Sequence, residues 1–233
     1  MTTLRVTFPN DWPGWSIQQY ILQSVQEPCL TDAIPITARV HSETYSDFYS
    51  DSPVFRASLI GPLIGPPKQA AIVALKFAFR EDLIADLTEE AEVYKGALES
   101  LQGTAVPRCY GLYNGYGVDG EPIACLMLEY WGECIHQPFE HLPLNVRIRI
   151  LQRLGDIHKQ GLVHGDFAER NVLELDGDVR IIDFDQTENH RCDCDMDFRP
   201  GEMSPDMQEF GCAQLWKVCR SDMKIWSDRE RHV

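Results

Sequence analysis

One polar stretch followed by a short hairpin constrains the fold of this chain more than any other feature. Residues 164–171 read HGDFAERN, and two apolar runs follow, residues 172–175 and 179–182. The turn between these runs contains Asp176-Gly177, and Asp-Gly between apolar runs is a strong hairpin signal. Asp183 comes directly after the second run. The hairpin therefore predicts that Asn171 and Asp183 lie at one edge of a cleft.

Three side chains around this hairpin form a chemically coherent set. Asp166 lies in a loop after a predicted helix, where its carboxylate can accept or orient the proton of a substrate hydroxyl. Asn171 and Asp183 supply two oxygen ligands, and Mg²⁺ is typically held by few protein ligands together with waters and substrate phosphates. A base and two ligands for a hard cation are the minimum equipment for phosphoryl transfer.

The stretch resembles the signature of protein kinases, in which H-R-D-x-x-x-x-N is the catalytic loop and D-F-G holds the metal. Two positions differ: Gly165 replaces the arginine, and Asp185 replaces the glycine. An aspartate at position 185 looks more like RIO-type atypical kinases or aminoglycoside phosphotransferases than ordinary Ser/Thr kinases. The resemblance implies ATP and Mg²⁺ as cofactors, with Asp166 catalytic and with Asn171 and Asp183 as metal ligands.

A lysine interrupts the apolar run at residues 70–79, which predicts a buried strand. Lys76, in Val-Ala-Leu-Lys, resembles the V-A-I-K strand whose lysine grips the nucleotide phosphates. A buried ammonium needs a carboxylate or phosphate partner, whereas a lysine at a strand edge can reach solvent. In the next helix, predicted to start near Asp86, Glu90 falls on the apolar stripe and Glu92 on the polar face. We expect a Lys76–Glu90 ion pair, with Glu92 as the alternative partner.

A later stretch resembles the hinge of a kinase. It reads Leu128-Glu129-Tyr130-Trp131-Gly132. By that resemblance, Leu128 would line the back of the nucleotide pocket. The backbones of Glu129 and Trp131 would hydrogen-bond the adenine. Residues 45–53 stand where kinases carry a glycine-rich phosphate loop, but they contain no glycine. Without glycine the backbone cannot approach phosphate as closely.

The resemblance implies an α+β, bilobal protein kinase-like fold. It would have a five-stranded antiparallel N-lobe sheet and a truncated helical C-lobe. We expect residues 1–36 to be a helical extension with a helix over 16–26, residues 37–131 to form the N-lobe and residues 132–233 the short C-lobe. Within the C-lobe we expect a helix over 144–160 ended by Gly161, a second from Asp206 through Cys219, and then a charged tail.

Two further features of the C-lobe have alternative interpretations. His158, on the long helix, is interpreted as a packed core histidine rather than a ligand. Cys192 and Cys194 form a C-x-C pair in an acidic segment. Such a pair can belong to a zinc site, but without a second pair it is a weak signal, and a solvated acidic loop is the preferred interpretation.

The acidic composition restricts the partners. The chain has 36 Asp and Glu against 21 Lys and Arg, a formal net charge of -15. This charge argues against binding to nucleic acid and to anionic membrane surfaces, because like charges repel. The N-terminus does not read as a signal peptide, and no apolar run has the length of a bilayer crossing. We expect an intracellular, cytoplasmic protein, with the nucleus also open, whose eight cysteines are mostly reduced.

The sequence thus predicts a kinase that transfers the γ-phosphoryl group of ATP to a hydroxyl, and a protein hydroxyl is the preferred acceptor. One alternative is a pseudokinase, a nucleotide-binding or scaffolding module, which the glycine-free loop, Asp185 and the short C-lobe favour. Another is a small-molecule kinase, which Gly165 and Asp185 favour. The joint presence of Lys76, Asp166, Asn171 and Asp183 favours catalysis, because a scaffold has no physical need of all four.

Overall fold

The computed structural model describes residues 2–10, 17–25, 35–42, 52–60 and 71–227. The chain divides into two compact units, and each is described by itself. The first unit comprises Met1–Lys95 and Arg108–Tyr130, and the second comprises Gly96–Pro107 and Trp131–Val233. Within the described residues, no helix has the length and apolar character needed to span a bilayer.

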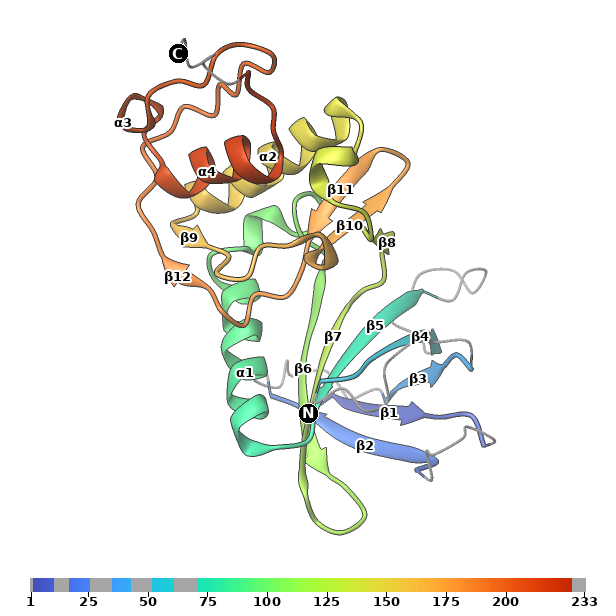
Figure 1. Cartoon of the computed structure of the whole chain (residues 1–233). Helices are drawn as coiled ribbons and strands as arrows, with labels where there is room; N and C mark the ends of the chain where they lie inside the picture. Colours follow the sequence, from blue (N-terminus) through green and yellow to red (C-terminus); the bar gives the residue numbers. More distant parts are fainter. Residues whose placement is uncertain (1, 11–16, 26–34, 43–51, 61–70, 228–233) are drawn as a thin grey trace. The chain divides into compact units, whose positions relative to one another are not determined.

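The first unit contains a closed sheet of seven strands, so the expected five-stranded antiparallel sheet is wrong. The order around the sheet is β1-β2-β6-β7-β5-β4-β3 (Figure 1). All neighbouring strands are antiparallel except β1 and β3, whose parallel pairing closes the sheet. The strands are β1 (Thr3–Thr7), β2 (Gln19–Ser24), β3 (Ile36–Val40), β4 (Val54–Ile60), β5 (Ile72–Ala78), β6 (Cys109–Tyr116) and β7 (Pro122–Glu129).

The N-terminal segment supplies two of these strands instead of the predicted helical extension. Strand β2 occupies the centre of the helix expected over residues 16–26. Its buried and exposed residues alternate, so Tyr20 and Leu22 point into the core whereas Ile21 faces solvent. The apolar spacing of this short segment is compatible with either period. Pairing with β1 on one side and β6 on the other selects the strand.

Aromatic rings fill the interior of the closed sheet. Phe8 packs edge-to-face on Tyr20 and on Phe55, with ring centroids 5.6 and 5.4 Å apart, and Phe55 packs on Phe77 at 5.6 Å. Since side chains alternate along a strand, β5 directs Phe77 into this core and Lys76 to the opposite face.

Helix α1 (Glu81–Lys95) packs on the outside of the closed sheet, against β5, β6 and β7 (Figure 1). It begins before the predicted start near Asp86. Thr88 lies inside the helix and donates to the carbonyl oxygen of Ile84 at 2.6 Å. The buried residues of α1 are Leu87, Glu90 and Tyr94, so one carboxylate faces the sheet.

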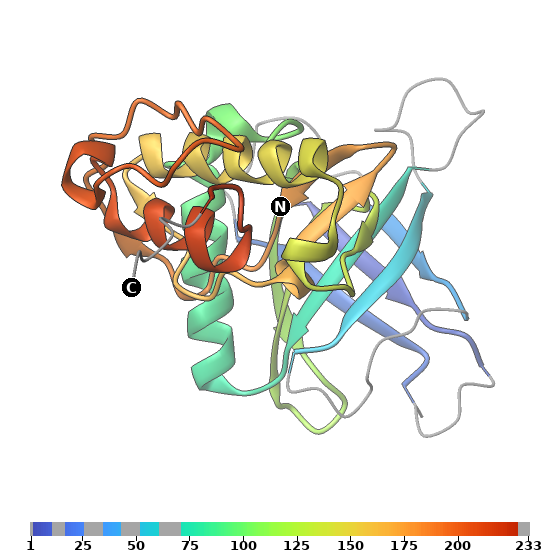
Figure 2. The same cartoon turned by 45° about the horizontal axis from the view of Figure 1, so that its top comes forward.

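The second unit is built on α2 (Leu144–Lys159) and a small sheet. The sheet order is β11-β10-β8, from Asp178–Ile181, Val172–Leu175 and Glu133–Cys134. Helix α2 packs against β11, and Figure 2 shows the yellow helix beside the orange hairpin. Both the long helix and the hairpin are confirmed, and Gly161 (φ +85°) follows the helix in the left-handed conformation expected of its C-cap.

The later part of the second unit departs from the expected helix and tail. Gly211 (φ +80°) ends α3 (Met207–Phe210), and a new helix, α4 (Ala213–Lys217), begins after Cys212. The helix expected from Asp206 through Cys219 is therefore broken. The segment expected to be a charged tail is packed as far as residue 227, because Met223 and Ile225 are buried. The remaining elements are β9 (Leu162–Val163), paired with β12 (Glu188–Asn189), a π-helical turn at Val218–Asp222, and 3₁₀ turns at Glu99–Leu101, Phe139–His141 and Glu169–Asn171.

Candidate functional site

Lys76 and Glu90 form an ion pair in the first unit. Nζ of Lys76 donates to Oε2 of Glu90 at 2.8 Å. Both side chains are largely removed from water, with 14% of Lys76 and 1% of Glu90 exposed. Glu92, the alternative partner, lies on the exposed face of α1, 3.5 Å from Nζ of Lys95. The ion pair expected from the facing of the helix is thus present.

The residues predicted to contact adenine lie at and after the end of β7. Leu128 is buried. The backbone N–H of Glu129 donates to the carbonyl oxygen of Arg108 at 2.8 Å, so an adenine contact at Glu129 would use its carbonyl oxygen. Trp131 belongs to the second unit, where the guanidinium of Arg180 lies 4.3 Å from the centre of its ring.

Asp166 is held by two neighbours along the loop of the second unit. Nη2 of Arg170 lies 2.5 Å from Oδ2 of Asp166. Nδ2 of Asn171 donates to the backbone oxygen of Asp166 at 2.8 Å and approaches its Oδ2 at 3.4 Å. Because the amide nitrogen of Asn171 is directed at Asp166, its amide oxygen is the atom suited to bind a cation.

His164 links this loop to the strand that leads to Asp183. Its Nε2–H donates to the carbonyl oxygen of Ile182 at 2.8 Å. Burial lowers the pKa of His164, which keeps the ring neutral. The N–H of Ile182 in turn donates to the carbonyl oxygen of Asn171 at 3.0 Å. These two bonds brace the loop against the hairpin.

The backbone of Asp183 is in the left-handed region, with φ of +74°. This conformation is uncommon for a residue other than glycine, and it persists only where the surrounding structure imposes it. Phe184, the next residue, is buried, and its ring centre lies 5.0 Å from that of His164. Backbone strain of this kind gathers at functional sites, and it occurs here at Asp183 as well as at Asp176 in the hairpin turn.

The structure explains why glycine replaces arginine at position 165. Gly165 has φ of +80°, and a Cβ built on it would lie 1.9 Å from the backbone oxygen of Gln186. No side chain fits there without moving the segment after Asp185. The departure from the kinase pattern is therefore built into the backbone of this loop.

Two supporting contacts escape the sequence analysis. Oε1 of Glu169 accepts from the backbone N–H of Phe139 at 3.0 Å. The ring of Phe139 also stacks on Phe167, with centroids 5.3 Å apart and planes 16° apart. Both contacts join the loop to a segment about thirty residues earlier, so no local sequence pattern predicts them. The Asp166–Arg170 pair, by contrast, has an i, i+4 spacing that is visible in the sequence.

The predicted site residues fall into two sets. The first unit holds Lys76, Glu90, Leu128 and Glu129, and the second holds Trp131, Asp166, Asn171 and Asp183. Within the second set, Asp166 and Asn171 are in contact, and Asp183 follows the residue that bonds both His164 and Asn171. The predicted phosphate loop, residues 45–53, lies outside the described residues except for its last two.

Known proteins similar to this chain include a KEOPS complex subunit and a serine/threonine-protein kinase, while no family model matches the chain. KEOPS complex subunit Bud32 of Pyrococcus abyssi is 25% identical over 151 residues, covering 63% of this chain and 62% of that protein. Human serine/threonine-protein kinase 31 is 25% identical over 194 residues, covering 73% of this chain and 19% of that protein. These similarities support the protein kinase-like superfamily. The chain spans less than two thirds of the length of either relative.

Proposed function

We propose that this chain is a kinase that transfers the γ-phosphoryl group of ATP to a hydroxyl in a Mg²⁺-dependent reaction. The observation that carries the proposal is the arrangement of the second-unit loop, in which Asp166 contacts Asn171 and a strained Asp183 follows their hydrogen-bonded hairpin. A base beside two cation ligands is the set that phosphoryl transfer needs. Similarity to a serine/threonine-protein kinase supports the same reaction class.

Each residue has a distinct role in this proposal. Lys76, held by Glu90, would bind the nucleotide phosphates, and the backbones of Glu129 and Trp131 would bind adenine beside Leu128. Asn171 and Asp183 would hold Mg²⁺, which neutralises charge on the phosphates. Asp166, oriented by Arg170 and Asn171, would receive the hydrogen bond of the acceptor hydroxyl. Most of the rate enhancement would come from positioning and charge neutralisation.

For the acceptor, we favour a protein hydroxyl, in the cytoplasm or nucleus. Gly165 favours a second candidate, a small-molecule acceptor, because the backbone there excludes the arginine onto which a phosphorylated activation loop usually docks. A pseudokinase that binds nucleotide or acts as a scaffold is the third candidate, supported by the glycine-free sequence of residues 45–53.

A thermal-shift titration with ATP, with and without Mg²⁺, tests the proposal. Wild-type protein should be stabilised by ATP with Mg²⁺, because a ligand that binds the native state raises the melting temperature. Asp183→Asn should abolish the Mg²⁺-dependent part. Asparagine tolerates the left-handed backbone, so this variant removes the charge without adding strain. Asp176→Asn is the matched control, since Asp176 also has positive φ (52°) but lies in the hairpin turn.

The outcomes separate the candidates. An unchanged Mg²⁺-dependent shift in Asp183→Asn would remove Asp183 from the mechanism. Stabilisation by ATP and Mg²⁺ without any release of ADP in the presence of protein and small-molecule hydroxyl acceptors would favour the pseudokinase. Loss of the shift in Asp183→Asn, its retention in Asp176→Asn, and turnover by the wild type would support the kinase.

A further inference from the structure

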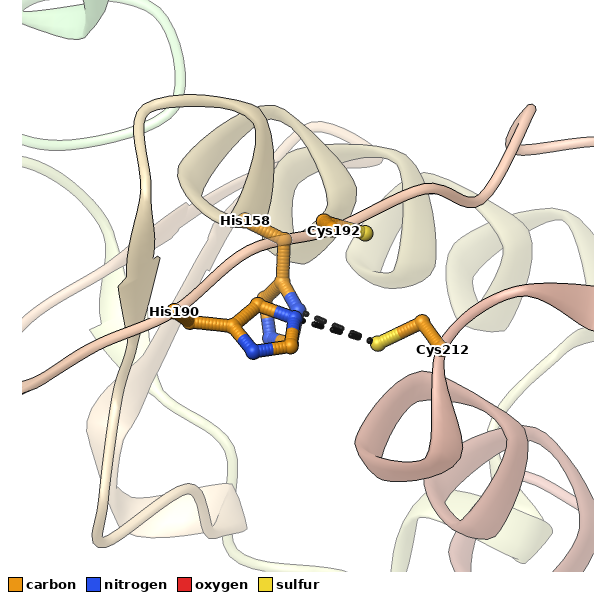
Figure 3. A group of neighbouring side chains, drawn as sticks. All are labelled: His158, His190, Cys192 and Cys212. Atoms are coloured by element: carbon orange, nitrogen blue, oxygen red, sulfur yellow. Dashed lines mark hydrogen bonds between the residues drawn. The ribbon is translucent and has the colours of Figure 1, made fainter.

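Four side chains that the proposed function does not use converge at one point in the second unit. His158 comes from the last turn of α2, His190 follows β12, Cys192 lies two residues later, and Cys212 directly precedes α4 (Figure 3). Each offers one nitrogen or sulfur atom, and these four atoms all lie within 4.8 Å of one another. The group thus joins three parts of the chain that are distant in sequence.

Two separations, both from the sulfur of Cys212, match those of a tetrahedral metal site. Sγ of Cys212 lies 3.5 Å from Nδ1 of His158 and 3.4 Å from Nε2 of His190. Zinc bonds of about 2.3 Å to sulfur and about 2.0 Å to nitrogen place a sulfur and a nitrogen ligand roughly 3.5 Å apart in a tetrahedron. The two imidazole rings meet edge-to-face, with planes 74° apart, so their nitrogens can point at a common centre without stacking.

We propose that His158, His190, Cys192 and Cys212 form a structural zinc site. Two thiolates and two imidazoles are a ligand set that Zn²⁺ favours, whereas Mg²⁺ and Ca²⁺ favour oxygen ligands. Four protein ligands complete the tetrahedron and leave no position for a reactive water, so the site is structural rather than catalytic. His158 and Cys212 are buried and the other two are half-buried, so the ion would be largely shielded from solvent.

Hydrogen bonding alone accounts poorly for the group. The Cys212 thiol has one proton, yet its sulfur contacts both imidazoles and lies 3.8 Å from Oε1 of Gln214.

The position of the site gives it a structural purpose. Residues 190–206 contain no helix and no strand beyond one isolated bridge at Met203, and so long an irregular segment needs an external constraint. Zinc bound here would tie the start of the segment, and Cys212 beyond its end, to α2. Inside the segment, Met196 packs on Gly155 of α2 so closely that a Cβ at that glycine would lie 2.6 Å from its sulfur. Metal binding would therefore contribute to the folding free energy of the second unit.

The C-x-C pair of the sequence contributes only one of its cysteines to this site. Cys194 is buried, and its sulfur accepts from the backbone N–H of Met196 at 3.3 Å. It is not one of the four grouped residues. Cys194→Ser is therefore a matched control for Cys192→Ser, in the same segment and with the same chemical change.

Zinc content of the full-length protein tests the site. After purification and dialysis, mass spectrometry of the metal should find stoichiometric zinc in the wild type and in Cys194→Ser. Cys192→Ser and His190→Ala should bind zinc at least about tenfold more weakly. Removal of a ligand, or even of a residue that supports it, typically costs 10- to 100-fold in metal affinity. Both substituted residues are half-exposed, so the variants do not open a buried cavity. Zinc retained in Cys192→Ser but lost from Cys194→Ser would overturn the assignment.

A cobalt titration of chelator-treated wild-type protein decides the question without any variant. Four ligands of this kind should give the intense visible bands of tetrahedral Co²⁺ and a sulfur-to-cobalt charge-transfer band. Chelation should also lower the melting temperature of the wild type, and zinc should restore it. The proposal would be refuted if the protein showed neither stoichiometric zinc nor the tetrahedral spectrum. A native disulfide between Cys192 and Cys212 would also refute it. Because the assay follows metal and not ATP, its failure is distinguishable from failure of the kinase proposal.

Discussion

The ammonium of Lys76 and the carboxylate of Glu90 meet at 2.8 Å on the outer face of β5, where Glu90 is fully buried. Glu90→Gln removes the negative charge that pairs with this ammonium at 2.8 Å. We expect a loss of about 3 kcal/mol in the free energy of unfolding, because removing one partner of a buried ion pair is strongly destabilising. Urea unfolding measures it. The matched control is Glu92→Gln on the exposed face of the same helix, which should change the value by less than about 0.5 kcal/mol. Equal losses in the two variants would contradict this account of the pair.

Gly165 and Gly177 share a φ of +80° but differ in their surroundings. At Gly177 a Cβ meets nothing within 4 Å, so Gly177→Ala should cost only the left-handed strain of about 1 kcal/mol. At Gly165 the same Cβ would strike the backbone oxygen of Gln186. Gly165→Ala should therefore cost more than about 3 kcal/mol, in the range reserved for severe steric conflicts. Thermal unfolding of both variants compares them, and similar losses would mean that the loop moves easily.

The sequence predicts those parts of the candidate site that have a local or periodic signature. The Asp-Gly turn predicts the hairpin between Asn171 and Asp183. The helical period predicts that Glu90, rather than Glu92, pairs with Lys76. The seven-stranded closure is not predictable in this way. It depends on the parallel pairing of β1 with β3. For residues 19–24, the long-range pairing with β1 and β6 decides between strand and helix.

The cluster around His158 shows the same limit in the second unit. Sequence spacing indicates only that His158 faces inward on α2, which is correct. Its neighbours come from residues 190, 192 and 212, and an irregular segment brings them together. Periodicity carries no information about such a segment, so the C-x-C spacing drew attention to Cys194, which is outside the group, and gave no sign of Cys212.

We expect ionisation of Tyr20 to lower the stability of the protein at alkaline pH. Burial in the closed sheet, assisted by the charge of Glu121, raises its pKa from 10.0 to about 12. Between these values the unfolded state releases the phenolic proton while the native state keeps it, so stability falls as pH rises from about 10 to about 12. The slope from this residue is at most about 1.4 kcal/mol per pH unit.

Tyr20→Phe should flatten that alkaline slope while keeping the buried ring. Urea midpoints of wild type and variant, measured across the same pH window, test the effect. Some slope should remain, because burial also raises the pKa of Tyr113 to about 12. Parallel slopes for wild type and Tyr20→Phe would show that Tyr20 ionises equally in the folded and unfolded states.

His164 provides a test of how the loop is attached to the hairpin. The ring is buried and donates to the carbonyl oxygen of Ile182, whose N–H bonds Asn171. His164→Phe keeps an aromatic ring in place but leaves that buried carbonyl without its donor, at a cost of about 1–3 kcal/mol. Hydrogen exchange should then accelerate in residues 164–186 more than in α2, because the bonds that join loop and hairpin open together.

His141→Phe, at an exposed 3₁₀ turn, is the control and should leave exchange unchanged. If exchange in His164→Phe rises uniformly through the second unit, the histidine stabilises the whole unit and does not specifically attach the loop.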